Sequence, residues 1–124
     1  ARRRGPVVLG GRSMGGRMAS MVAADVDDAG PVERLAGLVL ICYPLHPPGT
    51  TERLRVEHFP AITVPCLFVS GTRDPFGSPD ELAEWTATIP APVEHHWIDG
   101  GRHDLRGADD EIASAVAAFV GGLG

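Results

Sequence analysis

The stretch PVVLGGRSMGGRM, residues 6–18, decides the fold of this chain. It opens with a short apolar run, which predicts a buried β-strand over about residues 6–9. Met14, Met18, Met21 and Val22 then recur at helical spacing. This spacing predicts a helix over residues 14–24 with these four side chains on its buried face. The residue at position 13, a serine, therefore lies where a strand turns directly into a helix.

The same stretch contains the pattern G-x-S-x-G between Gly11 and Gly15. In a strand-to-helix turn this pattern is typical of a nucleophile elbow, a strained turn that exposes a serine hydroxyl beside the amino end of a helix. Glycine at Gly11 and Gly15 is expected to remove clashes across the turn. The pattern therefore predicts Ser13 as a nucleophile. A glycine-rich turn can also hold a phosphate, but the spacing GxxxxGK[ST] is absent and GxGxxG does not fit residues 10–16.

Length and composition indicate one globular domain and argue against nucleic acid and membrane as partners. The chain has 124 residues, of which 44% are hydrophobic and 22% charged, and its formal net charge is −5. Nucleic acids and anionic membranes are bound by clustered Lys and Arg, and only residues 2–4 form a basic run. No apolar stretch reaches the ~20 residues that a membrane span needs. We therefore expect neither nucleic acid nor membrane as a partner.

The two cysteines, Cys42 and Cys66, lie in apolar runs of strand character. We expect both to be buried free thiols, which indicates a reducing compartment and hence the cytoplasm. No cluster of Cys and His has the sequence spacing of zinc ligands, so no metal is expected.

Further strands and helices alternate along the rest of the chain. A continuous apolar run predicts a strand over residues 35–42, and further strands are predicted over residues 65–70 and 93–98. A proline-rich connection over residues 43–60 holds at most one helical turn, and long connections of this kind are often functional. This order of elements predicts an α/β fold, a parallel sheet with flanking helices.

Two later helices carry clear start signals. Ser78, Pro79 and Glu81 together predict a capping box, and acidic residues 109–111 favour the start of the last helix. The last helix is expected to stop at Gly121 and Gly122. The side chains expected to be buried are Leu82, Trp85 and Ile89 in the first of these helices and Ile112, Ala115, Val116, Phe119 and Val120 in the second.

Ser13, Asp74 and His103 each follow a different predicted strand. The carboxyl ends of parallel strands open at one edge of a sheet, so we expect these side chains to meet there. A serine hydroxyl needs a base within hydrogen-bond reach, and the base needs a third group that holds its tautomer. The chain order Ser, Asp, His is the one that accompanies a nucleophile elbow. The residues therefore predict a Ser-Asp-His triad.

Other residues compete for these roles. His46 also follows a strand and is the alternative base, but its place before Asp74 and beside prolines favours a role in the substrate pocket, where Arg12 is expected as well. Asp99 and Asp104 are alternative acids, although Asp99 is expected to end a strand and Asp104 directly follows the candidate histidine. Three further histidines are weaker candidates for the base, because His95 and His96 are expected within a strand and His58 in the middle of a loop.

Four pieces occur in this order: GGRSMGGRMAS (10–20), CYPLHPPG (42–49), GTRDPFG (71–77) and GGRHDL (100–105). With them the chain resembles the small dienelactone-hydrolase-like branch of the α/β-hydrolase superfamily over nearly its whole length. The resemblance implies Ser13 as nucleophile, Asp74 as acid, His103 as base and the backbone N–H of Met14 as one oxyanion donor. Dienelactone hydrolases proper have cysteine where Ser13 stands, so lactone substrates are not implied. Relatives of this branch also include proteins of chromatin-modifying complexes.

The resemblance also implies that residues 1–124 are a single incomplete domain, the carboxyl-terminal part of an α/β-hydrolase fold (strands 5–8) without its amino-terminal strands. The whole domain would have about 200 residues. Its missing segment would hold the second oxyanion donor, and losing such a donor lowers turnover about 10²–10³-fold. The first strand would then be a bare sheet edge through which copies could associate.

These observations predict a cofactor-independent serine hydrolase that acts on small esters, thioesters or related acyl compounds through an acyl-enzyme. The alternative is a non-catalytic interaction module of the same fold. A phosphate or nucleotide binder is the third hypothesis.

Overall fold

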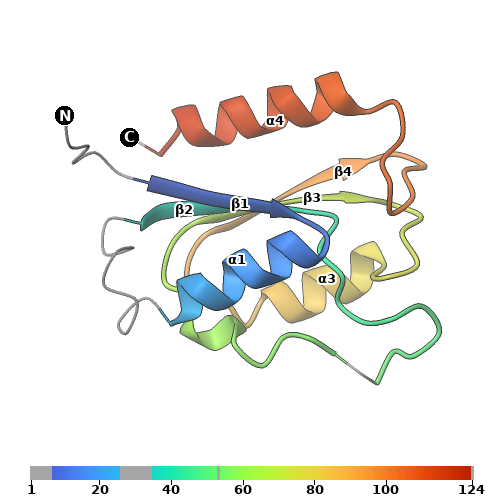
Figure 1. Ribbon diagram of the computed structural model, residues 1–124, viewed down its shortest axis with the longest axis horizontal. Coiled ribbons are helices and arrows are strands. Elements are labelled where there is room, and N and C mark those ends of the chain that lie inside the picture. The colour runs from blue at the N-terminus through green and yellow to red at the C-terminus, as the bar shows by residue number, and fades with distance from the viewer. Residues whose placement is uncertain (1–6, 26–34, 53, 124) are drawn as a thin grey trace.

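The computed structural model of the protein describes residues 7–25, 35–52 and 54–123. In these residues four strands form one parallel sheet in the order β1-β2-β3-β4 (Figure 1). The strands are β1 (Val7–Arg12), β2 (Leu35–Ile41), β3 (Cys66–Gly71) and β4 (Val93–Ile98). The helices are α1 (Met14–Ala24), the 3-10 turn η1 (Phe59–Ala61), α3 (Pro79–Thr86) and α4 (Asp109–Gly121). The predicted α/β fold with a parallel sheet is confirmed.

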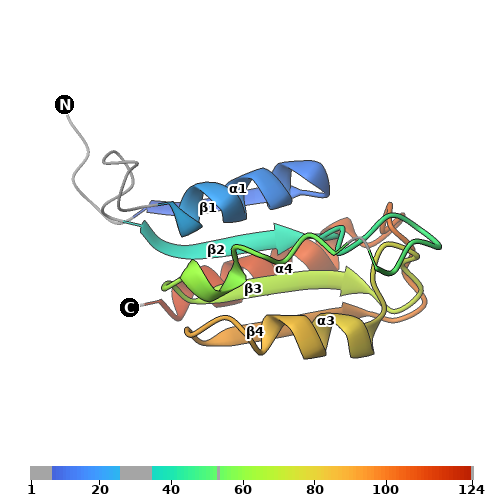
Figure 2. The same ribbon diagram turned by 90° about the horizontal axis from the view of Figure 1, so that it is seen from below.

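The sheet is covered on both faces. Helices α1 and α3 lie on one side together with η1, and α4 lies on the other (Figures 1 and 2). Leu40 and Phe68 belong to the core on the α1 and α3 side, whereas Val39 and Val69 belong to the core under α4. Successive side chains of a strand point to opposite faces, so a strand that is buried on both faces must be apolar throughout. This explains the unbroken apolar run in β2.

The long connection between β2 and β3 is part of the core. Tyr43, Leu45 and Phe59 are each at most 1% exposed. The Tyr43 hydroxyl donates to the carbonyl oxygen of Arg55 at 2.7 Å. As predicted, the described part of this connection contains a single helical turn, η1, and packed loop covers the sheet there.

Strand β1 is longer than predicted, because it continues through Gly10 and Gly11 to Arg12 before the chain turns at Ser13. All six residues from Val7 to Arg12 pair with β2. The expected start of this strand at Pro6 lies outside the described residues.

The predicted buried face of α1 is wrong. Met14, Met18, Met21 and Val22 are 47%, 54%, 38% and 42% exposed. The buried residues of α1 are small: Gly16, Ser20 and Ala23. Small side chains let the helix approach the sheet closely, so the stripe of large apolar residues is left facing outward.

The capping box of α3 is confirmed: Glu81 N–H donates to Ser78 Oγ at 3.2 Å, and Ser78 N–H donates to Glu81 Oε1 at 2.9 Å. Ile89 is buried as predicted but lies beyond the end of α3 at Thr86. In α4, Ile112 and Phe119 are buried as predicted, whereas Val120 is 43% exposed, so that prediction is wrong.

Cys42 and Cys66 are both free and buried, which confirms their predicted state. Within the described part of the chain, no helix is both long and apolar enough to cross a membrane.

Candidate active site

Ser13 occupies a strained turn between β1 and α1. Its dihedral angles are φ 53° and ψ −121°, a conformation that residues other than glycine rarely adopt. Its N–H donates to Ile41 O in β2 at 2.7 Å, and its carbonyl accepts from Arg17 N–H at 3.1 Å, the first hydrogen bond of the helix. The side chain is therefore held at the carboxyl edge of the sheet beside the amino end of α1.

Two glycines make this turn possible. A Cβ on Gly11 would lie 2.3 Å from the carbonyl carbon and oxygen of Gly15, and a Cβ on Gly16 would lie 2.9 Å from Gly11 O. A Cβ on Gly15 would meet no described atom within 4 Å. The predicted clash at Gly11 is confirmed, the one at Gly15 is wrong, and Gly16 is a requirement that the G-x-S-x-G pattern does not include.

Ser13, His103 and Asp74 form one hydrogen-bonded chain. Ser13 Oγ lies 2.6 Å from His103 Nε2, and His103 Nδ1 lies 2.8 Å from Asp74 Oδ2. An ionised carboxylate only accepts, so Nδ1 carries the ring hydrogen and Nε2 is free to accept the serine proton. The other carboxylate oxygen, Asp74 Oδ1, accepts from Phe76 N–H at 2.8 Å. This arrangement can deprotonate a serine hydroxyl.

The loops that carry Asp74 and His103 are joined backbone to backbone. A Cβ on Gly71 would lie 2.1 Å from Gly101 O, so only glycine allows this approach. Arg73 N–H donates to Gly101 O at 2.8 Å. These contacts fix the position of the acid relative to the base, and in the sequence they are signalled only by glycines at the two points of contact, Gly71 at the end of β3 and Gly101.

Burial differs along the hydrogen-bonded chain. The Asp74 side chain is 2% exposed and that of His103 is 24% exposed. The Phe76 ring covers one side of the His103 ring, with centroids 4.1 Å apart and planes tilted by 30°. The carboxylate is thus shielded from water while the imidazole reaches the surface where a substrate would arrive.

Arg12 and Met14 flank Ser13. The exposed Arg12 guanidinium donates to the carbonyl oxygen of Asp104, and so ties the elbow to the loop that carries His103. Met14 is the first residue of α1, and the first N–H groups of a helix have no partner within it. The Met14 N–H is thus in the position where an oxyanion donor would be expected.

The alternative candidates for the base and the acid, His46 and Asp104, are not part of the hydrogen-bonded triad. The His46 side chain is 3% exposed, and its ring nitrogens contact Pro47 O and Glu81, so it is not placed to act as the base; its role in the substrate pocket stays a prediction. The Asp104 carboxylate accepts from Arg106 N–H at 3.2 Å instead of holding a histidine. Neither residue competes for the proposed roles.

The remaining histidines lie away from the triad and contact other side chains. Nε2 of His58 lies 2.7 Å from Ser20 Oγ, Nε2 of His95 lies 3.0 Å from Thr86 Oγ1, and Nε2 of His96 lies 2.8 Å from Glu111 Oε2.

Cys42 lies beside the triad and was not singled out from the sequence. Its sulfur, a carboxylate oxygen of Asp74 and a ring nitrogen of His103 all lie within 4.8 Å of one another. Burial raises the pKa of the Cys42 thiol to about 11, so at neutral pH it is a thiol and not the thiolate that binds metals. Asp74 and His103 are already engaged with each other. The sulfur therefore packs against the pair without adding a ligand set.

Solved structures with the same fold are hydrolases of low sequence identity. The esterase domain of a Rhodothermus marinus protein matches with a TM-score of 0.70 and 15% identity, covering 92% of this chain and 60% of that one. Est1E from Butyrivibrio proteoclasticus with bound ferulic acid matches with a TM-score of 0.72 and 14% identity, covering 93% of this chain and 58% of that one. The monoacylglycerol lipase of Paleococcus ferrophilus matches with a TM-score of 0.77 and 11% identity, covering 97% of this chain and 70% of that one.

These matches establish the fold, and the chain spans only about three-fifths of the first two structures. The four parallel strands and flanking helices are thus part of an α/β-hydrolase fold. The family model described as an alpha/beta hydrolase domain matches residues 1–117. By this match over most of its length, the chain belongs to the alpha/beta hydrolase family.

Proposed function

We propose that this chain carries the catalytic residues of a serine hydrolase that cleaves small esters, thioesters or related acyl compounds. The main support is the unbroken hydrogen-bonded chain, with 2.6 Å between Ser13 Oγ and His103 Nε2 and 2.8 Å between His103 Nδ1 and Asp74 Oδ2. The strained backbone of Ser13 supports it too, because strain of this kind gathers at functional sites.

The reaction would proceed in two acyl transfers. Ser13 Oγ attacks the acyl carbon as His103 Nε2 takes its proton, and Asp74 stabilises the imidazolium. The C–O or C–S bond of the substrate then breaks, and the leaving group takes this proton. Water attacks the acyl-enzyme, giving its proton to the same nitrogen, which returns it to Ser13 as the acid leaves. Each step moves only an acyl group and a proton, so no cofactor is needed.

The Met14 N–H is the proposed donor to the tetrahedral oxyanion, since it follows the nucleophile at the start of α1. A relative with bound ferulic acid supports small acyl substrates as a class. On the four sequence pieces given above, we place the chain in the dienelactone-hydrolase-like branch. Ser13 replaces the cysteine of the dienelactone enzymes, so esters are proposed in preference to lactones.

Labelling with a fluorophosphonate probe tests the nucleophile in the full chain. Wild type should be labelled and should hydrolyse p-nitrophenyl acetate, and Ser13→Ala should lose both. Cys42→Ser is the matched control, because Cys42 is the other nucleophilic side chain near His103 and should be dispensable. Labelling that survives in Ser13→Ala would refute the assignment.

The alternative, a non-catalytic interaction module, has one observation in its favour: the outward-facing apolar residues of α1, among them Met18 at 54% exposure. Strand β1 is also an edge of the described sheet, which supports self-association through this strand. If the chain is such an interaction module, it should bind a partner or a second copy of itself, and the fluorophosphonate probe should not label it. Sedimentation of Val7→Lys should show weaker self-association than wild type.

Two expectations stay predictions. That residues 1–124 are one incomplete domain is tested by comparing their melting and turnover with those of an amino-terminally extended form, and equal values would contradict it. A cytoplasmic location, expected from the free thiols, is tested by imaging a tagged full chain.

A further inference from the structure

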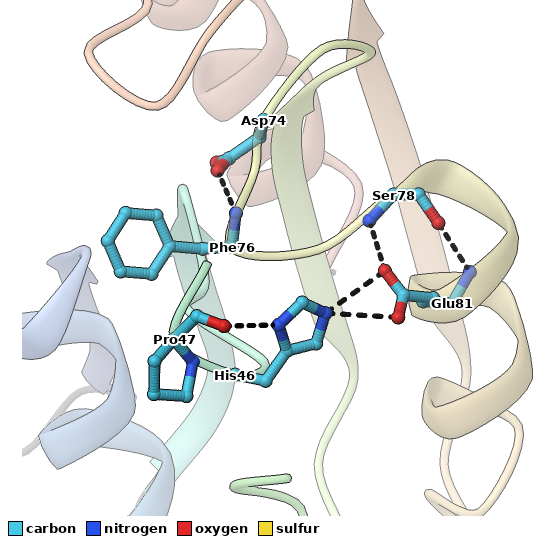
Figure 3. Close-up of polar contacts among 6 residues, drawn as sticks. All are labelled: His46, Pro47, Asp74, Phe76, Ser78 and Glu81. Atoms are coloured by element: carbon cyan, nitrogen blue, oxygen red, sulfur yellow. Dashed lines mark hydrogen bonds and ion pairs between the residues drawn. The ribbon is translucent and has the colours of Figure 1, made fainter. Parts of the chain in front are cut away.

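Both ring nitrogens of His46 face hydrogen-bond acceptors (Figure 3). Nδ1 lies 2.9 Å from Pro47 O, and Nε2 lies 3.1 and 3.0 Å from the two carboxylate oxygens of Glu81. A carbonyl and an ionised carboxylate have no hydrogen to give, so both ring nitrogens must donate. The geometry therefore requires His46 to be an imidazolium, although its side chain is only 3% exposed.

Two charged residues face this imidazolium from different segments: Glu81 in α3 attracts it, and Arg55 in the connection between β2 and β3 repels it. Burial opposes the charge, but the hydrogen bonds to Pro47 O and Glu81 outweigh it, so the pKa of His46 lies above its usual 6.5. The Ser78 N–H and then His46 lower the pKa of Glu81. Both shifts favour the ionic form of the pair.

This ion pair holds the segment that carries Asp74. We define the acid loop as residues 72–78, between β3 and α3. The backbone N–H of His46 donates to Phe76 O at 3.1 Å, and the Glu81 carboxylate, which the His46 ring holds, accepts from Ser78 N–H at 2.9 Å. Phe76 N–H in turn donates to Asp74 Oδ1 at 2.8 Å (Figure 3). The backbone of His46 is therefore two hydrogen bonds from the candidate catalytic carboxylate, and its imidazolium reaches the acid loop through Glu81 and the Ser78 N–H.

Phe76 also connects the acid loop to the base, since its ring packs on His103 with centroids 4.1 Å apart. A shift of the loop would thus move the acid and the ring that flanks the base together. We propose that His46, as a cation paired with Glu81, is a positioning residue that fixes the acid loop and so aligns Asp74 and Phe76 with His103. This inference rests on the serine-hydrolase function proposed above.

A pH dependence follows from the positive charge that His46 carries in this arrangement. The folded pKa of His46 is raised, so the stabilisation that it gives the acid loop is complete below pH 6.5 and is lost as pH rises through the folded pKa. The basic limb of the kcat profile would therefore report the titration of His46.

The test is a kcat and KM profile from pH 5 to 10 (about the range that brackets a shifted histidine) for p-nitrophenyl acetate with the full chain. Glu81→Gln keeps the capping box but removes the carboxylate charge, and should move the basic limb down by about one pH unit. His46→Gln should lower kcat about tenfold or more with little change in KM, and should abolish the limb.

His96→Gln is the matched control, because His96 and Glu111 form an ion pair at 2.8 Å that is exposed and belongs to other elements. It should leave the profile unchanged. An unmoved basic limb in a folded Glu81→Gln protein would overturn the inference, as would an equal shift in His96→Gln.

An NMR readout separates this inference from the proposed function. The Phe76 amide and the His103 ring resonances should shift with the titration of His46, and this coupling should disappear in His46→Gln. Absence of coupling in wild type would overturn the positioning role even if the protein is an active hydrolase. Coupling without any probe labelling would sustain the positioning of the loop and reject the hydrolase function alone.

Discussion

In the described residues, two serine–histidine pairs have nearly the same distance between oxygen and nitrogen but differ in their surroundings. Ser13 Oγ lies 2.6 Å from His103 Nε2, and Ser20 Oγ lies 2.7 Å from His58 Nε2. The other nitrogen of His103 is bound by Asp74, whereas no carboxylate hydrogen-bonds His58 in the described residues. A short contact is therefore no evidence of a nucleophile.

The direction of the serine proton separates the pairs. Ser20 is fully buried in α1 and donates its hydroxyl hydrogen to Arg17 O at 2.7 Å, so it accepts from His58. Ser13 stands on a strained turn and faces an imidazole nitrogen that the Asp74 contact leaves free to accept. The strained turn at Ser13 and the contact of Asp74 with His103 suit the first pair to proton transfer. Within the described residues, Ser20 and His58 lack both features and form a structural contact.

The largest expected difference comes from removing each histidine. His103→Ala should lower kcat by a factor on the order of 10⁶, because the general base is lost. His58→Ala should change kcat less than about tenfold and should lower the melting temperature, since it leaves the Ser20 contact unfilled. Steady-state hydrolysis of p-nitrophenyl acetate and thermal melts of both variants measure this. Similar losses of kcat in the two would show that the pairs are not functionally distinct.

Removing the charge of Asp74, the third residue of the triad, should have the next largest effect on kcat. Asp74→Asn should lower kcat about 10⁴-fold, because an amide no longer holds the hydrogen on His103 Nδ1. Asp104→Asn should change kcat less than about tenfold, since the Asp104 carboxylate contacts only Arg106 N–H among the described hydrogen bonds. The same assay compares them, and a larger loss in Asp104→Asn would reassign the acid.

Much of the fold and of the triad could be predicted, because these features depend on residues that are close together in the sequence. Apolar runs predict β2 and β3, and Ser78 with Glu81 predicts the start of α3. Residues that follow parallel strands must share one edge of the sheet. These features can be predicted from the neighbouring residues in the sequence and from the fold class alone.

Features that depend on distant partners could not be predicted. Spacing detected α1, but which of its faces is buried depends on how closely Gly16 lets it approach the sheet. His46 lies between Leu45 and Pro47 in the sequence, and the carboxylate that makes it a cation, Glu81, is 35 residues away. The contact of Gly71 with Gly101 likewise appears only when the two loops are folded together.

The turn that distinguishes Ser13 from Ser20 can be tested through its glycines. In Gly11→Ala the new Cβ would lie 2.3 Å from the backbone of Gly15, so the free energy of unfolding should fall by about 2 kcal/mol or more. Gly15→Ala is the matched control: it meets open space in a helix and should be neutral or stabilise by up to about 1 kcal/mol. Urea unfolding measures both, and equal destabilisation would contradict the turn geometry.

The smallest expected effect is the acid sensitivity of the second pair. Burial, followed by the nearby Arg17 charge, lowers the pKa of His58, so below pH 6.5 the unfolded chain binds a proton more readily than the folded one. The free energy of unfolding should therefore decrease as pH falls through this range, by at most about 1.4 kcal/mol per pH unit for one group. Urea unfolding at about pH 7.5 and 5.5, on either side of the usual histidine pKa, should show a weaker decrease in His58→Gln than in wild type. An unchanged decrease would mean that the Ser20 and His58 pair does not titrate as a buried structural contact.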